Sequence, residues 1–87
     1  EAIEFMTASK GQPFFCYLPH HSIHNVVSAP EELIDAYRAK GAPEKGLNNA
    51  TYLAALDHMD RSFGLLREGL EKSGQWDNTA VVFLSDN

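Results

Sequence analysis

The stretch TAVVFLSDN, residues 79–87, decides the fold that the sequence predicts. Its first six residues are apolar or β-branched, without the alternation of a strand that faces water on one side. Such a run is typical of a strand buried on both faces, as in a parallel sheet covered by helices. Three polar residues follow it directly: Ser85, Asp86 and Asn87. The sequence therefore predicts a buried strand at about 79–84 that ends in oxygen-bearing side chains.

A second apolar run, FFCYL at residues 14–18, lies between Pro13 and Pro19 and has the same unbroken character. Two buried strands that are joined through helices favour a parallel pair with a right-handed crossover. The predicted fold class is therefore α/β, with two buried parallel strands at about 14–18 and 79–84.

Helices are expected between and before these strands. A short amphipathic segment opens the chain and stops near Gly11, and a second helix follows the S-x-x-E capping box of Ser28 and Glu31. The longest helix is predicted at about 49–73, because apolar residues recur there at spacings of three and four. This apolar stripe consists of Leu53, Leu56, Met59, Phe63, Leu66 and Leu70.

Polar groups follow both predicted strands, at the end where open α/β sheets bind their ligands. Parallel strands end at one edge, so the loop after the first strand and the S-D-N end are expected to share a crevice. That loop carries three histidines, His20, His21 and His24. Asp86 and Asn87 offer the oxygen ligands that Ca²⁺ and Mg²⁺ prefer. Two plainer interpretations stay open: S-D-N as a helix cap or Asx-turn, and the histidines as surface or packing residues.

The bulk composition excludes several classes of function. A net charge of -5 over 87 residues argues against a nucleic-acid or anionic-membrane surface. No apolar stretch approaches the roughly 20 residues needed to span a bilayer. Cys16, the single cysteine, excludes an internal disulfide, and its place in an apolar run favours a small core residue. We expect the chain to be an internal piece of a longer protein, whose compartment and oligomeric state the sequence does not indicate.

Three motifs in this order carry a family resemblance: PFFCYLPHHSIH, SAPEEL and YLAALDHMDRSFGLLREGLEKSGQWDNTAVVFLSDN. Together they resemble the sulfatase family, the formylglycine-dependent sulfuric ester hydrolases of the alkaline-phosphatase-like superfamily. The resemblance covers essentially the whole chain. It implies that residues 1–87 are part of one sulfatase catalytic domain and a fragment of an alkaline-phosphatase-like α/β sandwich.

The resemblance also implies roles for three residues. Asp86 and Asn87 fall on the S-D-N-G position, whose aspartate and asparagine ligate a divalent cation, usually Ca²⁺, with Mg²⁺ as the alternative. His24 falls on the histidine that contacts the sulfate, where it would neutralise charge or assist the leaving group. His20 and His21 match no functional position. The implied substrate is a small-molecule or carbohydrate sulfate ester.

Two departures from the family pattern shape these expectations. Val26 stands where the family commonly has proline, and the C-x-[PS]-x-R motif that supplies the formylglycine nucleophile is absent from the chain. Formylglycine is therefore expected elsewhere in the parent protein, and the isolated chain is expected to be inactive. The alternatives are a phosphoester or phosphonate hydrolase of the same superfamily and a non-catalytic structural fragment.

Overall fold

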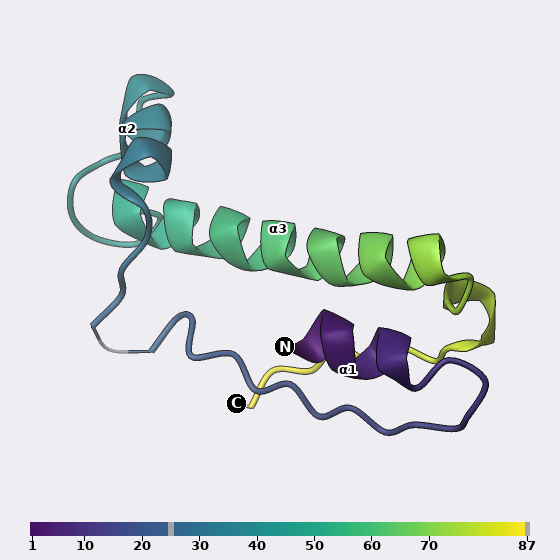
Figure 1. Cartoon of the computed structure of the whole chain (residues 1–87). Helices are drawn as coiled ribbons and strands as arrows, with labels where there is room; N and C mark the ends of the chain where they lie inside the picture. Colours follow the sequence, from purple (N-terminus) through teal and green to yellow (C-terminus); the bar gives the residue numbers. More distant parts are fainter. Residues whose placement is uncertain (25, 87) are drawn as a thin grey trace. The chain divides into compact units, whose positions relative to one another are not determined.

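A computed structural model of the chain describes residues 1–24 and 26–86. Its elements are α1 (Ala2–Ala8), α2 (Glu31–Ala39), α3 (Ala50–Ser73) and a short 3-10 helix, η1 (Trp76–Asn78) (Figure 1). The chain divides into two compact units. One comprises Glu1–Cys16 with Leu66–Asn87, and the other comprises Tyr17–Leu65, so that α3 contributes to both.

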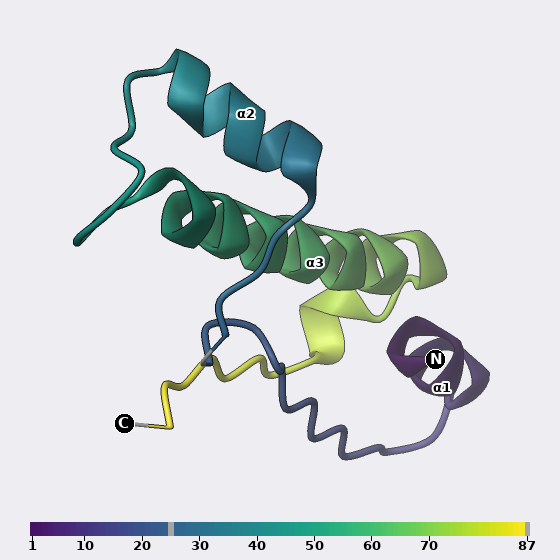
Figure 2. The same cartoon turned by 90° about the vertical axis from the view of Figure 1, so that its left-hand side faces the viewer.

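The predicted α/β fold is wrong, because the described part of the chain contains helices and no strands. The two runs at 14–18 and 79–84 follow an irregular or extended path, drawn as plain trace in Figure 2. None of their side chains is buried and most are exposed, with Phe15 at 86%, Val82 at 75% and Leu84 at 81%. A strand is defined by its backbone ladder with a neighbour, and neither run has such a neighbour among the described residues. Apolar, β-branched composition alone does not supply that ladder.

The long helix, in contrast, is confirmed almost to the residue. The Asn49 side chain accepts a hydrogen bond from the Tyr52 N–H at 3.0 Å and so caps the start of α3. Gly74, at φ 75°, takes the left-handed conformation that ends it. Of the predicted stripe, Leu70 is buried and the other five residues are half-buried. Although α3 has 24 residues, no helix in the described ranges is long and apolar enough to cross a membrane.

Within the unit Tyr17–Leu65, α2 packs on the first turns of α3 (Figure 2). The buried contact is made by Leu33 and Ile34 of α2 with Ala50 and Ala54 of α3. The predicted capping box is wrong, since the N-cap residue of α2 is Pro30 and no side chain caps the helix. Pro30 is extended, with ψ 133°, so the helix begins at Glu31 and the S-x-x-E spacing is out of register.

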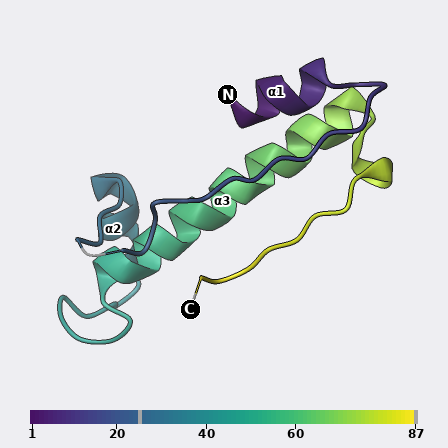
Figure 3. The same cartoon turned by 90° about the horizontal axis from the view of Figure 1, so that it is seen from below.

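Within the other unit, α1 lies along the last turns of α3 (Figure 3). Ile3 packs directly over Gly69, and the Gln75 side-chain amide donates a hydrogen bond to the Met6 carbonyl at 2.9 Å. The Arg67 guanidinium lies 5.1 Å from the centre of the Trp76 ring. These contacts hold α1 and η1 to the same end of α3.

Candidate functional site

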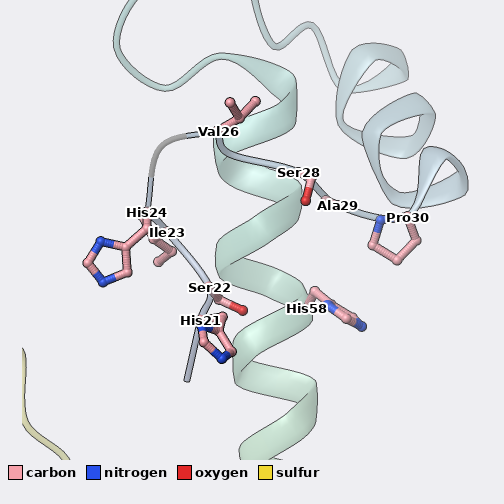
Figure 4. A pocket seen from close by; sticks show the side chains of 9 residues that line it. All are labelled: His21, Ser22, Ile23, His24, Val26, Ser28, Ala29, Pro30 and His58. Atoms are coloured by element: carbon pink, nitrogen blue, oxygen red, sulfur yellow. The ribbon is translucent and has the colours of Figure 1, made fainter. Parts of the chain in front are cut away.

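A pocket of about 390 Å³ lies within the unit Tyr17–Leu65 (Figure 4). The loop before α2 forms most of its wall, and α3 adds a single histidine. The lining residues are His21, Ser22, Ile23, His24, Val26, Ser28, Ala29, Pro30 and His58. The pocket thus includes His24, the predicted sulfate contact, and also a residue that sequence reasoning did not select, His58.

The backbone of the loop is strained one residue before His24. Ile23 has φ 73°, a left-handed conformation that is a genuine outlier for a β-branched residue. The chain therefore turns sharply one residue before His24, whose side chain is exposed at the pocket. In Figure 4 the rings of His24 and His58 point away from one another. In agreement, no group of three or more His, Cys, Asp or Glu side chains within residues 1–24 and 26–86 is placed to hold a metal ion.

The chemistry of the pocket lining suits a negatively charged ligand. Three imidazoles and two serine hydroxyls can each donate a hydrogen bond. None of the lining residues that the structure describes carries a carboxylate, although the chain as a whole has a net charge of -5. Donors without competing carboxylates are the arrangement that binds sulfate or phosphate oxygens.

Beside the pocket, a side-chain link connects α2 to α3. The Tyr37 hydroxyl donates a hydrogen bond to Asp57 Oδ2 at 3.1 Å, and the Arg61 guanidinium pairs with the same carboxylate. Arg61 is the main cause of the lowered pKa of Asp57, and the Tyr37 hydroxyl adds to it. Donation to Asp57 in turn raises the pKa of Tyr37. Asp57 directly precedes His58, which is the lining residue that α3 contributes. The link is therefore one residue away from the pocket along α3.

These pKa shifts predict how helix stability depends on pH. The interactions that lower the pKa of Asp57 stabilise the fold at pH values above its ordinary pKa of about 3.9. This contribution is lost as pH falls through the lowered pKa. The interactions that raise the pKa of Tyr37 stabilise the fold at pH values below about 10. This contribution is lost as pH rises through the raised pKa. Circular dichroism at 222 nm should therefore show an alkaline loss of helix that Tyr37→Phe removes. An unchanged alkaline transition in that variant would contradict the assignment.

The other predicted site residues lie outside this pocket. Asp86 is exposed at the end of the extended segment after η1, in the unit that contains α1. Asn87, the second predicted ligand, lies outside the described residues. The expected crevice shared by the histidine loop and the S-D-N end rested on a parallel strand pair. The described part of the structure has no such pair, so the prediction of a common edge has lost its basis.

Comparison with known proteins decides the family. A family model described as Sulfatase matches residues 1–87, the whole chain. The chain belongs to the sulfatase family. This sulfatase chain is 31% identical over 83 residues to a sulfatase of Formosa agariphila, and the match covers 86% of the chain. It is 33% identical over 92 residues, covering 100% of the chain, to the uncharacterized sulfatase YdeN of Escherichia coli.

A mammalian relative also matches this sulfatase chain. Arylsulfatase J of the mouse is 25% identical over 76 residues, which cover 87% of the chain. The match spans 15% of the length of each bacterial relative and 12% of the mouse protein. No solved structure gives a significant match. The family is therefore established from sequence, and the activity of the full-length protein is a matter for proposal.

Proposed function

We propose that the full-length protein hydrolyses sulfate esters and that this chain supplies His24 as a contact to the sulfate group. One observation carries the proposal: in a chain that matches the sulfatase family over residues 1–87, His24 lines a pocket of hydrogen-bond donors that has no carboxylate among its described lining residues. A sulfate ester keeps one negative charge, and donors aimed at its oxygens become more valuable as charge develops in the transition state. The substrate class is a small-molecule or carbohydrate sulfate ester.

The proposal includes a divalent cation, Ca²⁺ in preference to Mg²⁺, with Asp86 and Asn87 among its ligands. The donor chemistry of the two residues fits, because a carboxylate and a carboxamide offer the hard oxygen atoms that these ions bind. Asp86 is exposed in the structure. Ca²⁺ takes about six to eight oxygen ligands, so the remaining ligands must come from residues outside this pair. When bound, the cation would supply positive charge beside the sulfate.

The nucleophile lies outside this sequence. Formylglycine arises in the family from C-x-[PS]-x-R, and the chain has no such motif. Cys16, in the sequence CYLPH, is half-buried and lacks the required arginine. What these residues can contribute is therefore binding and charge neutralisation, not attack on sulfur.

Inorganic sulfate tests the proposed site directly. The imidazole signals of the 13C-labelled chain would be followed by NMR as sodium sulfate replaces sodium chloride at constant ionic strength. The His24 signal is expected to shift and saturate, while the signal of His20, which does not line the pocket, moves little. Inorganic phosphate, titrated in parallel, tests the alternative of a phosphoester hydrolase. Equal, unsaturable shifts of all four histidines would refute a sulfate site at His24.

A further inference from the structure

The width of the pocket depends on how α2 sits on α3. His58 reaches the pocket from α3, whereas Ala29 and Pro30 form the opposite end of the loop and run straight into α2 at Glu31. Ala29 also packs against the buried contact between the two helices. A sliding movement of α2 along α3 would therefore move the loop, with His24, relative to His58.

The apolar contact does little to prevent such sliding. On α3 it is made by Ala50 and Ala54, whose single methyl groups offer a smooth surface to Leu33 and Ile34. Burial of apolar area is favourable but non-directional, so it holds the helices together without defining one register. A hydrogen bond, in contrast, weakens steeply when its length or angle departs from the optimum.

The Tyr37–Asp57 link is a directional contact between these helices. The carboxylate of Asp57 is only 21% exposed and is held from the α3 side by Arg61, four residues along the helix. The Tyr37 ring is held on the α2 side by Lys40, whose Nζ lies 4.8 Å from the ring centre. Each partner of the hydrogen bond therefore also has a contact on its own side, Asp57 with Arg61 and Tyr37 with Lys40.

The principal charged side chain of α2 does not replace this link. Arg38 engages three carboxylates, and all of them belong to α2 or to the loop that follows it. These are Glu31, Asp35 and Glu44. Arg38 thus stabilises α2 itself and its connection, whereas Tyr37 makes a hydrogen bond to α3.

We propose that Asp57 is a positioning residue of the sulfate site, which fixes the register of α2 on α3 by holding Tyr37 and thereby sets where His24 lies relative to His58. The proposal rests on the proposed function, since the site that it positions is the sulfate contact of His24. It assigns no direct contact with substrate to Asp57 or Tyr37.

The test compares Tyr37→Phe and Asp57→Ala in the labelled chain, with Asp60→Ala as the matched control on the exposed side of the same helix. Both site variants are expected to shift the imidazole signals of His24 and His58 while the His20 signal stays in place. Half-saturation with inorganic sulfate should rise by roughly fivefold, the lower end of a usual coupling between sites. Asp60→Ala should change neither quantity. The double variant should move the His24 signal no further than the larger single effect, because both changes remove one link.

Helix content at 222 nm separates positioning from loss of folding. If Tyr37→Phe unfolds α2, Asp57→Ala decides the test, because it removes the acceptor of the tyrosine hydroxyl and introduces the residue with the highest helix propensity. Unmoved His24 and His58 signals in folded Asp57→Ala, or additive shifts in the double variant, would overturn the proposal. If the variants move His24 but sulfate shifts no pocket histidine even in the unmodified chain, the proposed function fails and the positioning role stands. If sulfate shifts His24 in the unmodified chain and the variants leave that response unchanged, the positioning role fails alone.

Discussion

Replacing His24 by alanine in the full-length sulfatase is expected to lower the turnover of a sulfate ester by about a hundredfold, the usual effect of removing one donor to a developing charge. The loss should appear in kcat more than in KM, because the contact strengthens as the ester bond breaks. Steady-state kinetics with an aryl sulfate would measure it. His20→Ala is the matched control, since His20 lies on the same loop but does not line the pocket.

Replacement of Asp86 by alanine should give a different pattern in the same assay. Its carboxylate is a proposed cation ligand, so Asp86→Ala should weaken Ca²⁺ binding measured by calorimetry, and added Ca²⁺ should restore part of the turnover. His24→Ala should leave Ca²⁺ affinity unchanged. Equal losses of turnover and thermal stability in His24→Ala would indicate a packing role. Unchanged Ca²⁺ affinity in both Asp86→Ala and Asn87→Ala would refute the cation site.

Adding one methyl group at Gly69 is expected to destabilise the packing of α1 on α3. A Cβ there would lie 2.8 Å from Ile3 Cγ2, 3.5 Å from Cγ1 and 3.7 Å from Cβ. Because Cγ2 is one bond from Cβ, it cannot swing away as the end of a long side chain would, and α1 must move. Overpacking of this kind costs about 1–3 kcal/mol, more than the gain of about 1 kcal/mol from replacing a helical glycine by alanine.

Gly64 provides the matched control for this experiment. It lies in the same helix, and a Cβ at Gly64 would meet nothing within 4 Å. Gly64→Ala should therefore stabilise α3 by about 1 kcal/mol through helix propensity alone. Thermal unfolding should be followed by circular dichroism and by the fluorescence of Trp76, the single tryptophan, which lies beside Arg67 near the end of α3. Equal stabilisation by both substitutions would show that α1 does not pack on Gly69.

Local sequence signals predicted the helices well. The recurrence of apolar residues from Leu53 to Leu70 predicted α3, because this periodicity depends on neighbouring residues only. The start of α2 was missed by two residues. There Pro30, with an extended ψ of 133°, is the N-cap, so the helix starts too late for the capping pattern of Ser28 and Glu31.

Local signals could not decide in the same way whether the two apolar runs form strands. A strand requires a partner distant in sequence, and the apolar runs at 14–18 and 79–84 contain no information about whether that partner is present. In the structure no residue of either run is buried, and most of them are exposed. The inference of a common sheet edge was lost with the strands, although the family resemblance, which rests on the order of motifs, was confirmed.

The site was partly predictable. His24 was selected by its place in a family motif, and the pocket around it agrees with a role in anion binding without testing that role. His58 was not selected, because Asp57, His58 and Asp60 lie so close in sequence that on a helix they span most of a turn. The link of Tyr37 to Asp57 joins residues 20 positions apart, and only the i, i+4 pair of Asp57 with Arg61 gave a local signal that this carboxylate is engaged.

The exposed run at 79–84 has a consequence for handling the isolated chain. Six uncharged residues rich in β-branched and aromatic side chains, with no proline, are the signature of segments that stack into cross-β fibrils. Four of them, Val81, Val82, Phe83 and Leu84, are exposed by 44–81%. Asp77 and Asp86, close on either side, act as acidic gatekeepers whose repulsion opposes such stacking. High salt, which screens that repulsion, should therefore be the condition under which this chain forms amyloid-like aggregates.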